Sequence, residues 1–434
     1  MKLFSTGKDV KFNVNFPIFK KVTRKLPMPH SEHVGVLNPN DKGTYLVCKE
    51  RLQIPINMAP ANQTNSDHTR DRGLFLARQE MWEELHDLIH AYDSGRNATE
   101  AGTPLADLII FGARADVVNA AEHALLHGRP AKGADFFSGV TALEYMIEEH
   151  SNSYALALIV AHMHIDIGWA WRGSAGREFV SKVNQDAFHA HFDRASDILS
   201  RFCPKKIQSP ALMSAHCALL PGHPHPAKRL NANFEALIKL DPHNSRHMRS
   251  LGNYLLPSWY GDFEQLDLQA RRIAATTYDL WGAGGYTWVW FDALLVDPAG
   301  LEVVEIEYFL DGVLDVLDRV RDQHVVNLMA AHLFRSWQTA RNRYLDNGLN
   351  QKITLSLRRG FEKVVREHLR EIHPLIWGHA EIGFDNASRI ISKERLAKKG
   401  KEIALHAVAI PFLAGLNAGQ TISFTPEGIT RIKP

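Results

Sequence analysis

The chain has 434 residues, of which 45% are hydrophobic and 23% are charged, and its net charge is +2. This near-neutral composition, with no basic stripe of interleaved aromatic residues, excludes nucleic acid as the expected partner, and the length suffices for a large core or an extended helix stack. The three cysteines lack CxxC spacing, and there is neither a signal-peptide core nor an apolar run of roughly 20 residues, so we expect a cytoplasmic protein without disulfides or membrane contact.

The first 69 residues predict an irregular arm with a few short strands. Hydrophobic and polar residues alternate from Val10 to Phe16, and the stretch from Thr44 to Ile56 is also extended in pattern and ends in prolines. From Asp71 onward the pattern changes, because apolar residues recur at steps of three and four residues.

That spacing predicts helices through most of the remaining chain. Gly, Pro, Asn and Asp occupy the links, and short links make successive helices antiparallel neighbours. The expected helices are 70–92, 104–127, 139–150, 153–171, 180–202, 209–219, 227–240, 244–256, 262–279, 283–296, 302–320, 322–346, 356–372 and 385–414. The segment from Thr421 to Ile432 predicts a small hairpin.

One stretch carries the sequence pattern of a repeat. The Leu-Asp-Pro-His-Asn link at 240–244, the Leu-Gly-Asn-Tyr run at 251–254 and the Gly-Asp-Phe turn at 261–263 resemble the tetratricopeptide repeat. In this interpretation Asn244 or Ser245 caps a helix, Gly252 permits close helix approach and Gly261 reverses the chain. The insertion around Pro257 lengthens the end of the first helix by about two residues relative to the usual repeat.

Two aromatic motifs extend the resemblance. Trp169 to Gly173 reads W-x-x-R-G, and Leu255 to Gly261 reads L-L-P-x-W-x-G. This pair of motifs is similar to that of an uncharacterised bacterial family, over about residues 138–296. The resemblance implies a tetratricopeptide-like fold and supplies no activity or catalytic residues.

The expected architecture is therefore mainly α. We predict tetratricopeptide-like antiparallel helix pairs, arranged as an α-solenoid or an irregular bundle, with a partly extended N-terminal arm. The expected divisions are the arm (1–69), a tetratricopeptide-like helical region (70–300) and a C-terminal helical region ending in a short hairpin (301–434).

The expected function is that of a non-enzymatic scaffold that binds a protein or peptide partner and needs no cofactor, because stacked helix pairs leave a concave face free. Trp and Tyr offer large contact area with a polar group, and an arginine can pair with an acidic group on a ligand. The alternative is that these aromatic side chains fill gaps between helices. The predicted partner-binding residues are Trp171, Arg172, Trp259, Tyr260, Trp281 and Tyr286.

Histidine spacing suggests an alternative function. His86 and His90, and likewise His123 and His127, are four residues apart on two consecutive predicted helices, and Glu83 precedes the first pair. Four imidazoles could converge on one divalent metal there, which would make the chain a metal-dependent enzyme in a helical bundle. A third possibility is a structural subunit of a larger assembly, marked by a large apolar surface on 302–346.

Overall fold

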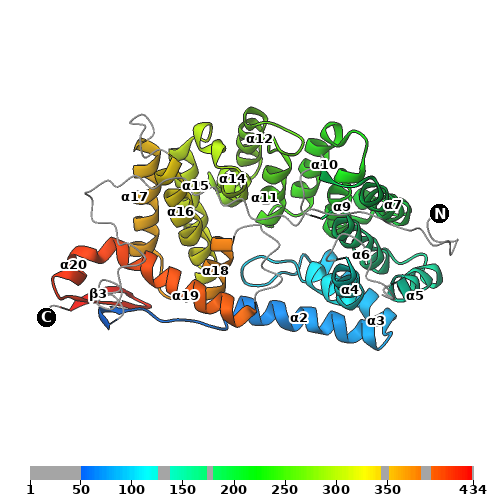
Figure 1. Ribbon diagram of the computed structural model, residues 1–434, viewed down its shortest axis with the longest axis horizontal. Coiled ribbons are helices and arrows are strands. Elements are labelled where there is room, and N and C mark those ends of the chain that lie inside the picture. Colours follow the sequence, from blue (N-terminus) through cyan, green and yellow to red (C-terminus); the bar gives the residue numbers. More distant parts are fainter. Residues whose placement is uncertain (1–49, 126–136, 174–178, 344–350, 383–391, 433–434) are drawn as a thin grey trace.

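A computed structural model describes residues 50–125, 137–173, 179–343, 351–382 and 392–432. The fold of these residues is mainly α, with one three-stranded sheet, as the sequence predicts. Helices α3 to α17 follow one another around an arc, and α2 and α19 run along its lower side (Figure 1). The sheet lies at one end of this arc, beside α20.

The first half of the chain forms the helices at one end of the arc. They are α2 (Ala61–Arg78), α3 (Trp82–Ser94), α4 (Leu105–Ala124), α5 (Phe137–Glu149), α6 (Tyr154–Arg172), α7 (Lys182–Leu199), α8 (Pro204–Ile207), α9 (Pro210–Ala218), the 3-10 helix η2 (Leu220–Gly222) and α10 (Pro226–Leu240).

The second half continues the arc and returns to the beginning of the described chain. Its elements are α11 (Ser245–Tyr254), α12 (Phe263–Thr276), α13 (Tyr278–Trp281), α14 (Gly284–Val296), η3 (Pro298–Glu302), α15 (Ile306–Arg319), α16 (Gln323–Arg343), α17 (Gln351–Glu367), α18 (Pro374–Ile382), α19 (Lys393–Ala409), η6 (Ile410–Phe412) and α20 (Leu413–Asn417). The strands are β1 (Leu52–Gln53), β2 (Thr421–Thr425) and β3 (Gly428–Ile432).

The predicted C-terminal hairpin is confirmed, and the N-terminal segment joins it. Strands β2 and β3 pair antiparallel, and β1 pairs parallel with β2 on the other side. Farther along, the amide of Asn57 donates to the Ile372 carbonyl at 2.9 Å. The described start of the chain is therefore fastened to the C-terminal half.

The expected end of the arm at residue 69 is wrong, because α2 already begins at Ala61. Its first half has no apolar periodicity, and the face that it buries is polar: Asn62, Ser66 and Thr69 are all buried. Asn62 Nδ2 lies 3.3 Å from His324 Nδ1, and its Oδ1 accepts from the Ala101 amide at 3.0 Å. The polar groups on this face are thus paired by hydrogen bonds to distant segments. A search for hydrophobic periodicity does not detect such a helix.

Several predicted helix bounds also differ. The expected helix 70–92 is divided between α2 and α3 at Glu80, which has a φ of 54°. The expected helix 262–279 ends at Thr276 as α12, and α18 forms over 374–382, where the sequence pattern predicts no helix. Part of the expected helix 385–414 lies outside the described residues, and α19 covers the rest from Lys393.

The described residues bury two hydrophobic cores. The first core runs from Leu76 to Leu219, and the second takes in residues from Met213 to Phe424 together with Leu52 and Ile54. Helix α9 serves both, since Leu212 belongs to the first core and Met213 to the second. The second core continues through residue 300 without a break.

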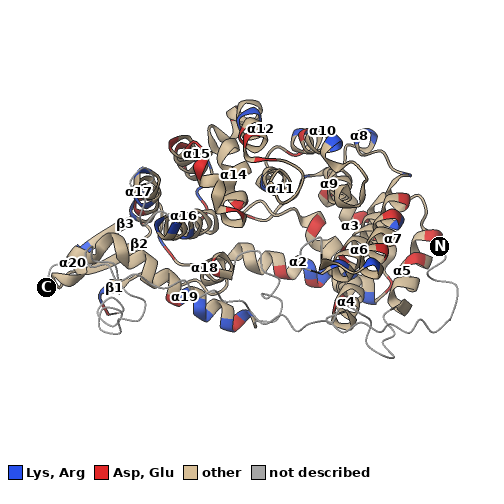
Figure 2. Ribbon diagram, turned by 45° about the horizontal axis from the view of Figure 1, so that its top comes forward, with Lys and Arg blue, Asp and Glu red and all other residues tan. Residues whose placement is uncertain are grey.

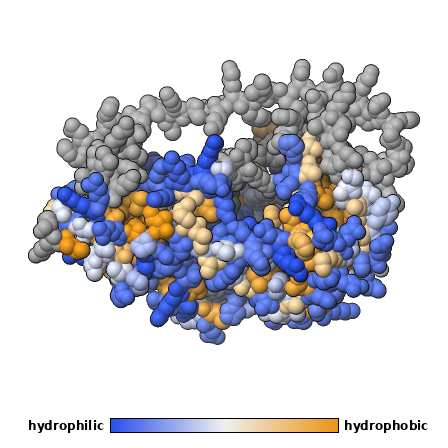
Figure 3. Space-filling view, turned by 90° about the horizontal axis from the view of Figure 1, so that it is seen from below, coloured by the Kyte–Doolittle hydropathy of each residue, from blue (hydrophilic) through white to orange (hydrophobic). Residues whose placement is uncertain are grey.

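Charged residues of both signs are interspersed over the helices (Figure 2). A local basic group lies at the start of α19, where Lys393, Arg395, Lys398 and Lys399 are exposed while Leu396 is buried. On the face seen from below, apolar patches are interrupted by hydrophilic side chains (Figure 3). Of the described helices, none is both long and apolar enough to span a lipid bilayer.

Candidate functional site

The two aromatic motifs of the sequence meet in space. Trp169 lies near the end of α6, while Trp259 follows α11, yet their ring centroids are 5.9 Å apart at an interplanar angle of 71°. Tyr254 stacks on Trp259 at 6.1 Å, and Tyr260 packs edge-on against it at 5.8 Å. We call these four side chains, Trp169, Tyr254, Trp259 and Tyr260, the aromatic cluster. It joins the first core to the second.

Trp259 is the exposed member of the aromatic cluster. Its side chain is 42% exposed, whereas Trp169 packs on Phe188 and Phe192 of α7 at 5.2 and 5.9 Å. The Arg172 guanidinium lies over the Trp169 ring, 5.5 Å from its centroid. A half-buried aromatic cluster with a cation over one of its rings is the kind of surface that partners use as an anchor.

The other predicted binding residues occupy different environments. Trp171 is partly buried and packs against the first core. Trp281 is 7% exposed, and its Nε1 donates to the Pro242 carbonyl at 2.8 Å. Tyr286 is fully buried, and its hydroxyl accepts from the Glu305 amide at 2.9 Å.

Placing Trp281 and Tyr286 on a binding surface is therefore wrong. Both belong to the second core, where their polar groups already have partners. The glycines between them explain the tight burial. A Cβ on Gly284 would come within 2.6 Å of a Val316 methyl group, and one on Gly285 within 2.5 Å of Thr277 Oγ1.

The predicted metal ligands do not gather in the described structure. His86 Nδ1 lies 2.6 Å from Ser153 Oγ, and His90 Nδ1 lies 3.0 Å from the Tyr154 hydroxyl. His123 is exposed near the end of α4, and His127 lies outside the described residues. Among the residues described, we find no group of three or more His, Cys, Asp or Glu side chains placed to hold a metal ion.

Glu83 and His86 instead line a hollow of about 430 Å³ with residues of the α5–α6 turn. Glu149 and His150 lie on the other side of this hollow. The sequence spacing thus locates Glu83 and His86 correctly on one helix face, but that face meets the α5–α6 turn.

A buried polar network lies in the first core. His164 Nε2 is 2.7 Å from Glu144 Oε1, and its Nδ1 is 2.8 Å from His191 Nδ1. Arg194 Nε donates to the same carboxylate at 2.8 Å. The sequence places His164 and His191 in H-x-H runs, but only the packing of α6 on α7 brings them together. Two residues farther along α6, the Asp166 carboxylate accepts a hydrogen bond from Arg114 Nε at 2.7 Å.

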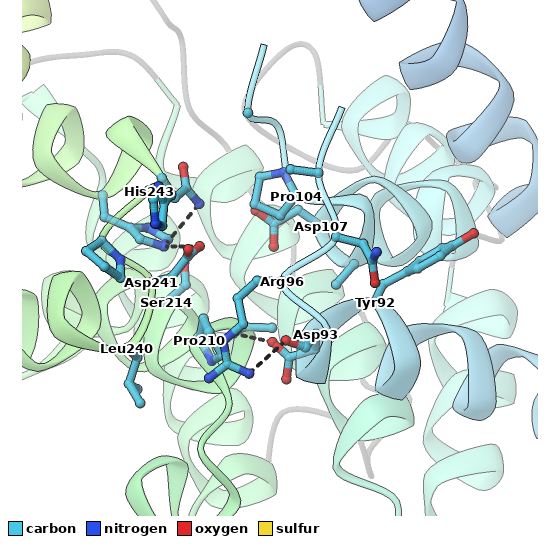
Figure 4. Close-up of a pocket in the computed structure, with 18 residues that line it drawn as sticks. Tyr92, Asp93, Arg96, Pro104, Asp107, Pro210, Ser214, Leu240, Asp241 and His243 are labelled. Carbon is cyan, nitrogen blue, oxygen red and sulfur yellow. Dashed lines mark hydrogen bonds and ion pairs between the residues drawn. The ribbon is translucent and has the colours of Figure 1, made fainter. Parts of the chain in front are cut away.

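The sequence gives no signal for a cavity at the boundary between the two cores. It has a volume of about 420 Å³ and is lined by the loop between α3 and α4, the start of α9 and the turn between α10 and α11. Figure 4 shows Ser214, Asp241 and His243 on one wall and Pro104 and Asp107 on the other. Boundaries between folding units often hold small-molecule sites of this size.

Three aspartates line this cavity, and each has a different environment. Asp93 is buried and accepts from the Ala211 amide at 2.9 Å and from the Tyr154 hydroxyl at 3.1 Å. Asp241 lies 3.4 Å from His247 Nε2. Asp107 makes no side-chain hydrogen bond or ion pair with another described residue, and burial raises the pKa of its carboxyl.

Comparison with known proteins assigns this chain to no family and gives it no function. No family profile matches this chain, and no curated protein or solved structure is similar enough to count as a match.

Proposed function

We propose that this protein is a non-enzymatic, tetratricopeptide-like helical scaffold that binds a protein or peptide partner through the aromatic cluster. One observation carries the proposal: Trp259 is 42% exposed although it stacks within a cluster of three other aromatic side chains. Exposed aromatic side chains that are held in one position by their neighbours are preferred anchors in interfaces.

The environment of Trp259 fits an anchor. Its ring is held by Trp169 and Tyr254, so little side-chain entropy is lost when a partner packs against it. The Arg172 charge on the adjacent ring favours a partner residue of opposite sign. The partner we infer is a peptide segment with an apolar or aromatic side chain next to an acidic residue.

The helical framework supports a scaffold. Asn244 caps α11 by accepting from the Arg246 amide at 3.1 Å, and Asp262 caps α12 by accepting from the Gln265 amide at 2.8 Å. These caps fall where the tetratricopeptide pattern requires helix starts. The close approach at Gly252 is made to α14, so the proposed repeat is an irregular one.

A cytoplasmic location belongs to the same proposal. Cys203 is an exposed free thiol and Cys217 is a buried one, which suits a reducing compartment.

A random peptide library displayed on phage tests this function. We expect the full chain to enrich peptides with an aromatic or aliphatic residue beside Asp or Glu. Selection on Arg172→Glu should shift the enriched peptides away from acidic residues while retaining the apolar anchor. If the parent enriches no peptide family above background, or if Trp259→Ala enriches the same family as strongly, the proposal is wrong.

A further inference from the structure

The cavity between the two cores has a solvent-exposed rim and a buried floor. Arg96, Ala98 and His243 at the rim are exposed, whereas Asp93 and His247 at the floor are 4% and 6% exposed. At about 420 Å³, it lies within the range of volumes that hold small organic ligands.

The walls combine aliphatic surface with negative charge. Pro104, Pro210, Leu240 and Pro242 contribute apolar surface from both sides of the cavity. An aliphatic chain can bury itself against such walls without leaving a polar group unpaired.

The carboxyl group available to a ligand is that of Asp107, and although burial raises its pKa, a cation bound beside it would favour the ionised form. The carboxylate of Asp93 is used in holding α9 and α6, and Asp241 is beside His247. Asp107 has no such contact with a described residue. Arg246 and His247 act on it through space, without an ion pair to it. An incompletely compensated carboxylate in a cavity with apolar walls favours a cation that carries its own aliphatic stem.

Arg96 does not compete for Asp107, because its guanidinium is held by main-chain carbonyl groups. Nη1 donates to the Ser94 carbonyl at 2.7 Å, and Nη2 donates to the Gln208 carbonyl at 2.9 Å. These bonds fix the α3–α4 loop against the residues before α9. The cavity is therefore shaped before any ligand arrives, which reduces the entropy cost of binding.

We propose that this cavity binds an alkylammonium group, with the cation at the Asp107 carboxylate and the aliphatic stem between Pro104 and Leu240. Such a group occurs in free alkylamines and in the lysine side chain of another protein. This site is separate from the aromatic cluster and does not depend on the function proposed for it.

Calorimetric titration of the full chain with 1,5-diaminopentane tests the proposal, with 1,5-pentanediol as the neutral analogue. We expect saturable binding of the diamine and none of the diol. Asp107→Asn keeps the shape and removes the charge, so it should weaken diamine binding about tenfold or more. The matched control is Asp71→Asn, which removes an exposed carboxylate of α2 outside the cavity and should bind like the parent.

Two further experiments complete the test. The first distinguishes a free amine from a lysine side chain as the ligand, and the second uses a variant outside the buried floor that should stay folded. A lysine-containing peptide and its Nε-acetylated form show whether a partner's lysine side chain binds as well as a free amine. If the diamine or the lysine peptide binds the parent and this binding is lost in Asp107→Asn, the proposed site is supported. Ala98→Phe at the exposed rim should narrow the mouth and weaken binding while the melting temperature stays unchanged. Binding of neither cation by the parent overturns the proposal, as does equal affinity of a folded Asp107→Asn. Trp259→Ala should bind the diamine normally.

Discussion

Individual side chains in this protein show how strongly partners determine the charge of a buried group. Glu144 is partly buried, and burial raises its pKa, but the hydrogen bonds from Arg194 and His164 outweigh this effect and bring the pKa to about 2. The ionised carboxylate therefore stabilises the fold, because its pKa in the unfolded chain is about 4.3. This stabilisation is complete above the unfolded pKa and is lost as the pH falls toward 2.

Glu144→Gln is expected to lower the free energy of unfolding by about 2–3 kcal/mol at neutral pH, since a charged hydrogen-bond acceptor is lost while Arg194 stays half-buried. The difference from the parent should shrink between pH of about 4.5 and about 2. Urea denaturation at several pH values measures both. A difference that stays constant over this pH range would show that the ionised carboxylate is not the source of the stability.

The sequence predicts the position of some candidate residues but not their environment. The motifs place Trp169 and Trp259 at helix ends, but the contact between the two rings depends on the packing of helices far apart in the sequence. The burial of Trp281 and Tyr286 depends on neighbours that lie far away in the sequence, such as Glu305. Hydrophobic spacing identifies a helix face, but it does not say whether another element covers that face. Asp107 and Asp241 are separated by more than a hundred residues, so no local pattern marks the cavity.

Among the elements, α11 connects the two candidate sites. Asn244 and His247 at its start line the cavity, and Tyr254 at its end belongs to the aromatic cluster. Its position is set by Gly252, because a Cβ there would overlap the carbonyl oxygen of Val289 on α14. The sequence predicts this close approach, and the structure identifies α14 as the helix approached.

Gly252→Ala is expected to lower the free energy of unfolding by about 1–3 kcal/mol, because the added methyl group forces α11 away from α14. The control is Ser250→Ala, an exposed change on the same helix that should be neutral or slightly stabilising. Thermal unfolding followed by circular dichroism compares them. Equal melting temperatures for the two variants would contradict the close packing described for this helix pair.

The element that sequence patterns located least well is α2. A helix with a buried polar face is stabilised by distant hydrogen bonds, such as that between Asn62 and the Ala101 amide. Such a helix has no hydrophobic period to detect. The capped helices α11 and α12 are the opposite case, because their start signals are local.

At the scale of the whole molecule, the segment before α2 fastens the beginning of the described chain to its end. Leu52 is 5% exposed in the second core, and its strand pairs with β2. Asn57 Nδ2 donates to Glu371 at 3.0 Å, and Lys393 forms an ion pair with Asp67 of α2. These contacts join α2 and the segment before it to the C-terminal half of the chain.

Leu52→Ala is expected to cost about 2–4 kcal/mol and to act mainly on the second core. Hydrogen exchange should become faster in β2 and α20, while α6 in the first core keeps its protection. Gln53→Ala, at the exposed neighbouring position, should leave both cores unchanged. Equal loss of protection in α6 would mean that the two cores unfold as one unit.

Whether Trp259 anchors a partner can be tested by the affinity of a library-selected peptide for the parent, Trp259→Ala and Tyr278→Ala. Tyr278 is 60% exposed and lies outside the aromatic cluster, so it matches Trp259 as an exposed aromatic side chain. Our prediction is that Trp259→Ala binds about tenfold or more weakly with a nearly unchanged melting temperature, whereas Tyr278→Ala binds like the parent. Unchanged affinity of a folded Trp259→Ala, or an equal loss in both variants, would contradict it.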